Sequence, residues 1–239
     1  MTYNVHSCIG LDKKLSVDRI ARVISRAKPD IIALQELDAG RKHKAGPNQA
    51  QRIAECLEMK FHYHPVYGSG SESFGNAVLS HLPFRVRQAE CLPGYKLRSI
   101  LECRGALWVE VECGGKIFHI INTHLSLWGR ERMQQFKRLM SADWLLSPDL
   151  KDQVTVLCGD FNMTSQSAVY RTLTKDFRDA GLEGRHGQPL KTWTSRWPIR
   201  RLDYIFVRGH AGVLETSVPH SDLEIHASDH LPLIADFSL

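Results

Sequence analysis

The chain has 239 residues, of which 43% are hydrophobic and 24% are charged. These proportions are ordinary for a globular protein and exclude an extensively disordered chain. The formal net charge of +5 attracts polyanions or anionic membranes only modestly, so it fits a phosphate-bearing substrate and an ordinary solvated surface equally well.

No apolar run approaches the length of a membrane span. The start, MTYNVHSC, lacks the basic and apolar regions of a signal peptide, although it leaves open a further segment upstream. We therefore expect a cytoplasmic monomer without a membrane span. The six cysteines include no C-x-x-C pair, so we expect buried thiols in a reducing compartment rather than a zinc ribbon or a disulfide framework.

Strand and helix patterns alternate along the chain, beginning with a short strand over residues 2–5. Apolar residues then recur at helical spacing, in a helix that Ser16 caps and that Pro29 and Asp30 end. A compact apolar run over residues 31–34 predicts a buried strand that leads into Gln35 and Glu36.

The rest of the chain continues this mixture. Gly114 and Gly115 between two apolar runs are a strong hairpin signal. Further helices are predicted over residues 48–58, 130–145 and 167–173, and further strands over residues 76–80, 106–113, 116–123, 154–158, 203–207 and 233–237. Because the sequence contains no internal repeat or linker, we expect one domain over residues 1–239, an α/β sandwich whose sheets carry helices on the outside.

Polar residues stand at the ends of several predicted strands, where the loops of a rigid sheet commonly carry catalytic groups. Each one alone is more often a turn or cap residue, and a histidine inside a strand, such as His119, is more often structural. Together they supply oxygen ligands, a carboxylate–imidazole pair and amide donors, which are the components of a magnesium site that attacks phosphate. They are Asn4, Glu36, His124, Asp160, Asn162, Asp203, Asp229 and His230.

The motifs TYNVH, LQE, NTHL, GDFN, RLDYIF and SDH occur in this order over nearly the whole chain. In this respect the sequence resembles the DNase-I-like endonuclease/exonuclease/phosphatase superfamily. GDFN together with a C-terminal SDH is the specific part of the resemblance, whereas LQE alone would be weak. The resemblance implies an α/β (α+β) fold, a four-layer αββα sandwich of two central mixed β-sheets flanked by helices.

The resemblance also implies a metal site. Glu36 is similar to the main ligand of Mg²⁺ in this superfamily, with Mn²⁺ as a substitute. Asn4 and Asp229 are similar to further ligands, direct or through water. A sparse ligand set is expected, since magnesium keeps several waters and takes one or two protein carboxylates.

For the catalytic groups, the resemblance implies that Asp160 orients or deprotonates the attacking water and that Asn162 donates to a phosphoryl oxygen. His230 would contact the phosphate or act as acid–base, with Asp203 fixing its ring and supporting the imidazolium. His124 would donate to the phosphate or to the leaving group.

Two departures bear on the substrate. His124 stands where many apurinic-site endonucleases of the superfamily carry tyrosine, and His6 stands where they commonly carry aspartate. Both favour the branch that contains DNase I, lipid phosphodiesterases and inositol-phosphate phosphatases, and His6 leaves the metal's full ligand set open. We therefore expect a magnesium-dependent phosphoesterase that hydrolyses a small or lipid-linked phosphodiester or phosphomonoester.

Two alternatives have different consequences. An endonuclease or exonuclease acting on DNA or RNA would use the same chemistry, but the sequence lacks a dense Lys/Arg tract. A catalytically silent binding module on this fold is disfavoured because the candidate catalytic residues are intact.

Arg104, at the entrance of a predicted strand, is the strongest candidate for a substrate contact, and Asn76 is the second. Arginine suits bidentate binding of phosphate. Other arginines, lysines and tryptophans near the motifs are expected mostly to be solvated charges or core aromatics: Arg41, Lys42, Trp128, Trp193, Trp197, Arg200 and Arg201.

Overall fold

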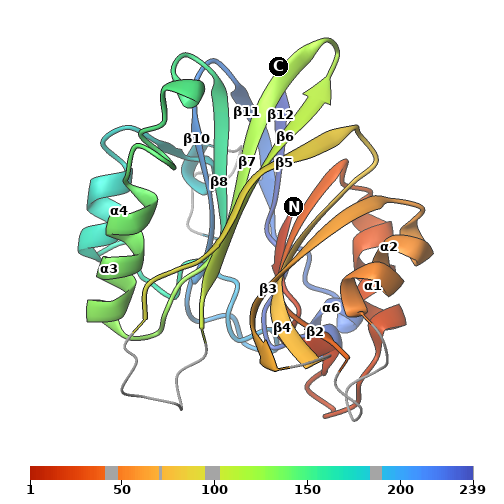
Figure 1. Cartoon of the computed structure of the whole chain (residues 1–239). Coiled ribbons are helices and arrows are strands. Elements are labelled where there is room, and N and C mark those ends of the chain that lie inside the picture. Colours follow the sequence, from red (N-terminus) through yellow and green to blue (C-terminus); the bar gives the residue numbers. More distant parts are fainter. Residues whose placement is uncertain (41–47, 70–71, 95–102, 184–189, 239) are drawn as a thin grey trace.

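Two β-sheets stand side by side at the centre of the computed structural model (Figure 1). The structure describes residues 1–40, 48–69, 72–94, 103–183 and 190–238. One sheet has the order β1-β2-β4-β3 and consists of β1 (Thr2–Asn4), β2 (Ile31–Ala39), β3 (Lys60–Ser69) and β4 (Glu72–Ser80). The other has the order β5-β6-β7-β8-β10-β9 and consists of β5 (Phe84–Cys91), β6 (Gly105–Cys113), β7 (Lys116–His124), β8 (Val154–Asp160), β9 (Arg178–Asp179) and β10 (Asp203–Arg208). A separate antiparallel pair consists of β11 (Gly212–Ser217) and β12 (Ile234–Ser238).

Helices cover the outer face of each large sheet, which gives the expected four-layer sandwich (Figure 1). Beside the four-stranded sheet lie α1 (Val17–Ala27), α2 (Gln49–Leu57) and α6 (Asp222–Ala227). Beside the six-stranded sheet lie α3 (Gly129–Leu139) and α4 (Ala168–Leu173). The short elements are α5 (Ala180–Glu183) and the 3-10 turns η1 (His6–Cys8) and η2 (Pro148–Leu150).

Three apolar cores hold the layers together, one between each sheet and its helices and one between the two sheets. Strand β2 contributes to two of them, because successive side chains of a strand point to opposite faces. Ile32 and Leu34 pack toward α1 and α2, whereas Ala33 faces the other sheet. Burial of both faces explains why these strands are continuous apolar runs in the sequence.

Helix boundaries mostly follow the predictions. The Oγ of Ser16 accepts a hydrogen bond from the backbone N–H of Arg19 at 3.2 Å, as expected of a cap. The helix predicted over residues 130–145 is too long, because α3 ends at Leu139. The backbone N–H of Leu145 donates to the Leu139 carbonyl at 2.9 Å, so the chain turns after the helix. Trp144 packs in the core beyond the end of the helix, and the apolar pattern in the sequence therefore continues past Leu139.

The expectation of buried cysteines is only partly right. Cys8 and Cys158 are buried, whereas Cys56, Cys91 and Cys103 are exposed and Cys113 is half-buried; all are free thiols. The sequence did not distinguish the buried cysteines from the exposed ones. Periodicity predicts the strand or helix in which a cysteine lies, but it does not show whether that cysteine is on the covered face. None of the helices in the described part of the chain is long and apolar enough to cross a membrane.

The strand pairings bring the polar ends of the strands to one end of the sandwich, the lower end in Figure 1. His124 at the end of β7 is the register partner of Asp160 at the end of the parallel strand β8. Asp160 in turn pairs with Asp203, the first residue of the antiparallel strand β10. In the other sheet, Asn4 at the end of β1 pairs with Gln35, directly before Glu36.

Candidate active site

Asn4 links carboxylates that come from the two different sheets. Its Nδ2 donates to Glu36 Oε1 at 2.9 Å and to Asp160 Oδ2 at 3.0 Å. The side chain is buried, and its Oδ1 accepts from the backbone N–H of His6 at 3.1 Å. The amide of Asn4 therefore links Glu36 and Asp160, and its role as a metal ligand stays a prediction.

A break in the regular pairing of β2 places Glu36 in the site. The register of β2 against β4 shifts between Leu34 and Leu37, and Glu36 has a φ of 61°. Such bulges redirect side chains, and a left-handed conformation at a residue other than glycine is uncommon and marks functional sites. The Glu36 carboxylate, which is 22% exposed, thereby reaches the end of the sheet instead of its face.

Asp160 is the buried carboxylate at the centre of the site. The preceding Gly159 has a φ of 141°, and a Cβ there would lie 1.8 Å from the Thr123 carbonyl oxygen, so only glycine lets β8 approach β7 this closely. The backbone N–H of Asn162 donates to Asp160 Oδ1 at 2.9 Å. Burial raises the pKa of Asp160 to about 7, although the charge of His230 opposes the rise.

Arg104 fixes the protonation of His124. One guanidinium nitrogen of Arg104 lies 3.0 Å from His124 Nδ1. Because a guanidinium only donates, Nδ1 accepts and the ring carries its proton on Nε2. Burial, followed by the charges of Arg104 and His230, lowers the pKa of His124 well below its ordinary value. The ring is therefore neutral, and its Nε2 lies 3.1 Å from the Nδ2 of Asn162.

His230 and Asp203 form a buried pair. Asp203 Oδ2 accepts from His230 Nδ1 at 2.8 Å, and His230 Nε2 lies 3.7 Å from Asp160 Oδ2. Burial lowers the pKa of His230, but the charges of Asp203 and Asp160 outweigh burial and raise it to about 10. The ring is therefore a cation at neutral pH, and its Nε2–H points toward Asp160.

Asp229 lies at the partly exposed side of the site and contacts His6 and Trp193. Its Oδ1 lies 3.1 Å from His6 Nδ1, and its Oδ2 accepts from the indole N–H of Trp193 at 3.4 Å. Burial raises the pKa of Asp229, yet the hydrogen bond with His6 and the charges of His230 and His6 lower it overall. The same hydrogen bond raises the pKa of His6. His6, whose role the sequence left open, is thus a direct partner of Asp229.

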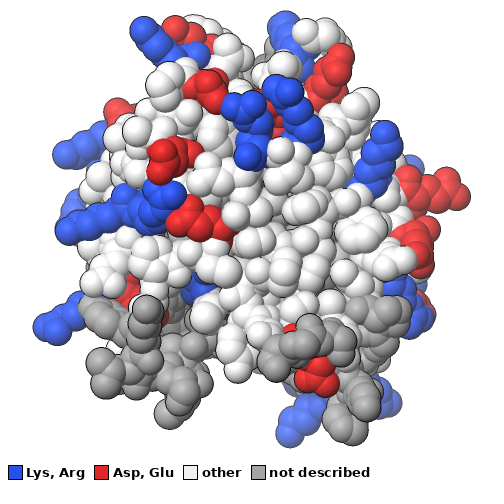
Figure 2. Space-filling model, in the orientation of Figure 1, with Lys and Arg blue, Asp and Glu red and all other residues white. Residues whose placement is uncertain are grey.

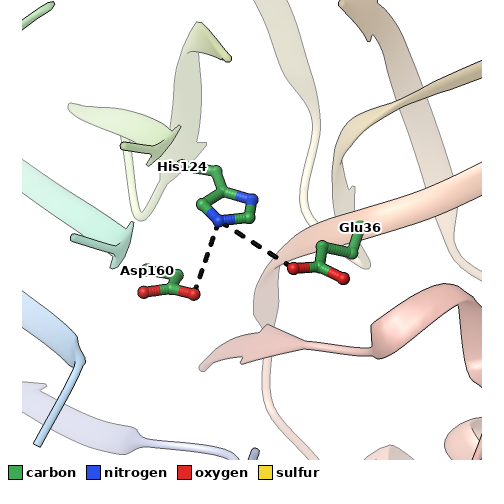
Figure 3. Close-up of side chains that lie close together, drawn as sticks. All are labelled: Glu36, His124 and Asp160. Carbon is green, nitrogen blue, oxygen red and sulfur yellow. Dashed lines mark ion pairs between the residues drawn. The ribbon is translucent and has the colours of Figure 1, made fainter. Parts of the chain in front are cut away.

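The donor set of the site fits a hard divalent cation. Glu36 Oε1 lies 3.9 Å and Asp160 Oδ2 lies 3.5 Å from His124 Nε2, and both carboxylates point toward the ring in Figure 3. The side-chain N and O atoms of Glu36, His124 and Asp160 lie within 4.8 Å of one another, as do those of Asp160, Asp203 and His230. Because both rings carry protons on the nitrogens that face the carboxylates, the carboxylates are the groups that can bind the cation. Carboxylate oxygens are the ligands that magnesium prefers.

Other residues proposed from the sequence have different positions. Asn76 is buried on β4, and its Nδ2 donates to the Gly105 carbonyl at 3.1 Å, so this donor is engaged next to Arg104. Arg201 is not the solvated charge that we expected, because it is buried and forms an ion pair with Asp179. Arg41 and Lys42 lie outside the described residues.

Two supporting residues were not proposed from the sequence. Ser228 Oγ donates to the Asn4 carbonyl at 2.8 Å, and its place in the SDH motif could have indicated it. Arg132 donates to the carbonyls of Ser126 at 2.9 Å and Asn162 at 2.6 Å. Arg132 stands in the first turn of a helix, and no local pattern distinguishes it from a solvated arginine.

Comparison with known proteins places this geometry in a family. The model of the Endonuclease/Exonuclease/phosphatase family matches residues 1–230, and the chain belongs to this family. Uncharacterized protein YbhP of Escherichia coli strain K12 is 28% identical over an alignment that covers 100% of this chain and 95% of that protein.

Solved structures share the fold at low sequence identity. An endonuclease/exonuclease/phosphatase from Beutenbergia cavernae matches with a TM-score of 0.84 and 24% identity over 100% of this chain and 70% of its own. The mannosyl-6-phosphatase of Bacteroides thetaiotaomicron matches with a TM-score of 0.78 and 18% identity over 100% and 98% of the two chains. The human Nocturnin catalytic domain matches with a TM-score of 0.71 and 23% identity over 99% and 91%. Members of the family are generally hydrolases, and many use divalent metals.

Proposed function

We propose that the protein is a magnesium-dependent phosphoesterase that hydrolyses a small or lipid-linked phosphoester by attack of water. The observation that carries the proposal is the contact between Asp160 and the buried Asp203–His230 pair: His230 Nδ1 donates to Asp203 Oδ2 at 2.8 Å, and His230 Nε2 lies 3.7 Å from Asp160 Oδ2. A buried carboxylate next to an imidazole that a second carboxylate orients is the acid–base arrangement that attack of water on a phosphoryl group requires.

The titratable groups of the candidate site have complementary protonation states. Asp160, whose pKa lies at about 7, accepts a proton from the attacking water near neutral pH. His230 is held as a cation by Asp203 and donates from Nε2 to the phosphoryl group or to the leaving oxygen. His124 stays neutral and donates without adding a charge. A base, a cationic acid and neutral donors therefore surround one small space.

The metal would be held mainly by Glu36, with Asp229 as a further ligand and Asn4 keeping Glu36 in position. When bound, Mg²⁺ supplies Lewis-acid stabilisation of the negative charge on the phosphoryl oxygens. Mn²⁺ should substitute, whereas Ca²⁺ should substitute poorly because its looser coordination positions the reacting groups less well.

A small or lipid-linked phosphoester is favoured over long nucleic acid. The net charge is only +5, and in Figure 2 the Lys and Arg side chains of the described residues are interspersed with Asp and Glu on that face. The mannosyl-6-phosphatase that shares the fold is, by its name, a phosphatase of a small phosphomonoester.

The test is a panel of nitrophenyl phosphates, inositol phosphates, phospholipids, plasmid DNA and RNA, assayed with Mg²⁺ or Mn²⁺. Glu36→Gln keeps the size of the side chain but removes its charge, so turnover should fall by more than about 100-fold, the upper range for losing an outer partner of a metal site. Glu112→Gln, an exposed glutamate at the far end of β6, is the matched control and should retain full activity.

Full activity in excess chelator would contradict the metal-dependent mechanism. Cleavage of plasmid DNA alone, with a steep fall between low and physiological salt, would support the nuclease alternative, because each neutralised phosphate releases counterions. A pocket for one phosphoryl group should lose far less activity over the same salt range.

A further inference from the structure

Two short loops beside the candidate active site expose large apolar side chains. Among the large hydrophobic residues that the structure describes, the most exposed are Trp197 at 73%, Leu127 at 69% and Ile199 at 61%. Trp128, next to Leu127, is 52% exposed. The sequence led us to expect core aromatics at Trp128 and Trp197, and that expectation is wrong. Single exposed apolar residues are normal, but four in two loops next to one site need an explanation.

The first loop follows β7 and is fixed to the site. The Asn162 Nδ2 donates to the Leu125 carbonyl at 3.0 Å, and Arg132 donates to the Leu127 carbonyl at 3.1 Å as well as to the carbonyl of Asn162. The backbone N–H of Trp128 donates to Ser126 Oγ at 3.2 Å. Leu127 and Trp128 are therefore presented to solvent by a backbone that is hydrogen-bonded to a candidate catalytic residue.

The second loop is a hairpin that starts at the other side of the site. Trp193 and Arg200 form its base through backbone hydrogen bonds of 2.7 and 2.9 Å. The indole of Trp193 and the backbone N–H of Ser195 both donate to Asp229, the latter at 2.8 Å to its carbonyl. The turn beyond this base carries Trp197 and Ile199.

Both loops leave the same end of the six-stranded sheet, where β7 ends and β10 begins. We call the exposed residues Leu127, Trp128, Trp197 and Ile199 the apolar rim. Exposed cations accompany the rim in both loops, whereas residues 125–130 and 191–201 contain no aspartate or glutamate; the cations are Arg130, Lys191, Arg196 and Arg200.

We propose that the apolar rim and its cations dock onto an anionic lipid surface, so that the phosphoester entering the site is lipid-borne. Tryptophan favours the interface between water and lipid, leucine and isoleucine gain by entering the apolar layer, and arginine and lysine are attracted to anionic headgroups. The docking surface stands on its own observations, and only the identity of the substrate rests on the function proposed above.

Single-stranded nucleic acid is the other anionic partner that tryptophans and arginines recognise, by stacking on bases and tracking the backbone. Such a partner gives no reason to expose Leu127 and Ile199, which have no aromatic face. Each loop pairs one tryptophan with one aliphatic side chain, and this pairing suits an apolar layer better than a stack of bases.

The test is sedimentation with vesicles of phosphatidylcholine, with or without phosphatidylglycerol. The wild-type protein should bind the anionic vesicles and should not bind phosphatidylcholine alone. Leu127→Ser combined with Trp197→Ser should weaken binding by about tenfold or more. Arg196→Gln combined with Arg200→Gln should weaken it by about fivefold per arginine, on anionic vesicles only.

The matched control combines Ile117→Ser with Leu214→Ser. These side chains are 46% and 56% exposed, and Ile117 stands seven residues before His124 on the same strand, about 23 Å away. The control should bind vesicles as the wild type does. Thermal unfolding of every variant shows whether a loss of binding reflects a loss of fold.

Three outcomes would overturn the proposal: no binding of anionic vesicles by the wild type, an equal loss in the control, or rim variants that lose binding of a single-stranded oligonucleotide instead of vesicles. Glu36→Gln separates docking from catalysis, since it should bind vesicles normally while hydrolysis is lost. If the wild type hydrolyses no phosphoester but still docks through the rim, the proposed function fails and the docking surface stands.

Discussion

The two ends of strands β7 and β8 have opposite chemistry. At one end, His124 and Asp160 lie among charged and polar partners. At the other end, Phe118 and Val154 are register partners and line a largely apolar cavity of about 250 Å³ between the sheets. The same pair of strands thus carries the candidate site at one end and part of the hydrophobic core at the other.

Residues with a positive φ occur at both ends, since Lys28, which lines the apolar cavity, has a φ of 49°. Glu36 and Asn162, both at the site, have φ angles of 61° and 48°, in the left-handed region that costs a residue with a side chain about 1 kcal/mol or more. The two ends therefore differ in the chemistry of their side chains and not in whether the backbone is strained. The predictions below test this division, from the largest effect to the smallest.

Asp203→Asn should remove the carboxylate that orients the His230 ring and stabilises its charge, without unfolding the protein. An asparagine amide can favour the wrong tautomer of the ring, and by analogy with a serine-protease triad the rate should fall by up to roughly 10⁴-fold, about 5 kcal/mol at the transition state. Asp236→Asn, at the opposite end of the sandwich, is the control. Steady-state kinetics with near-normal turnover for Asp203→Asn would remove the pair from the acid–base role.

Phe118→Ala should show the reverse behaviour. The side chain is buried at the apolar end, so its loss should lower the free energy of unfolding by about 3 kcal/mol. Because the site lies at the other end of the strand, kcat of the folded enzyme should stay close to that of the wild type. Urea unfolding and turnover below the transition measure the two effects. A large fall in kcat of the folded variant would show that the two ends are coupled.

Arg104→Gln tests the assignment of the His124 proton. Without the guanidinium, Nδ1 loses its donor and the ring can adopt the other tautomer, so kcat should fall by about 10- to 100-fold, or about 1.4 to 2.8 kcal/mol. Arg85→Gln, an exposed arginine on β5, is the control. A rise in KM with kcat unchanged would instead make Arg104 a substrate contact, as the sequence alone suggested.

Glu36→Gly should raise stability while removing activity. Glycine adopts a positive φ without strain, so the free energy of unfolding should rise by about 1 kcal/mol. Lys28, the C-cap of α1 at a φ of 49°, offers a matched position away from the site, and Lys28→Gly should stabilise similarly and keep full activity. A strong fall in the free energy of unfolding of Glu36→Gly in denaturant titrations would show that the positive φ of Glu36 does not lower the stability of the protein.

Much of the candidate site could be predicted because its residues stand at the ends of apolar strands. Strand ends are visible in the sequence, and Asp160 and Asp203 could be proposed from the runs before and after them. The structure brings these residues together with Asn4, Glu36 and His230 at one end of the sandwich. Their catalytic roles remain predictions.

The sequence by itself determined the layered fold, the cap at Ser16 and the family, since these depend on local spacing and motif order. Only the tertiary structure shows that Glu36 has a left-handed backbone conformation, that Arg104 donates a hydrogen bond to His124 and that Trp197 is exposed. Each of these depends on which segments, distant in the sequence, pack against a residue. The sequence shows where an apolar tryptophan stands in the chain. The packing of the whole chain determines whether other residues cover it.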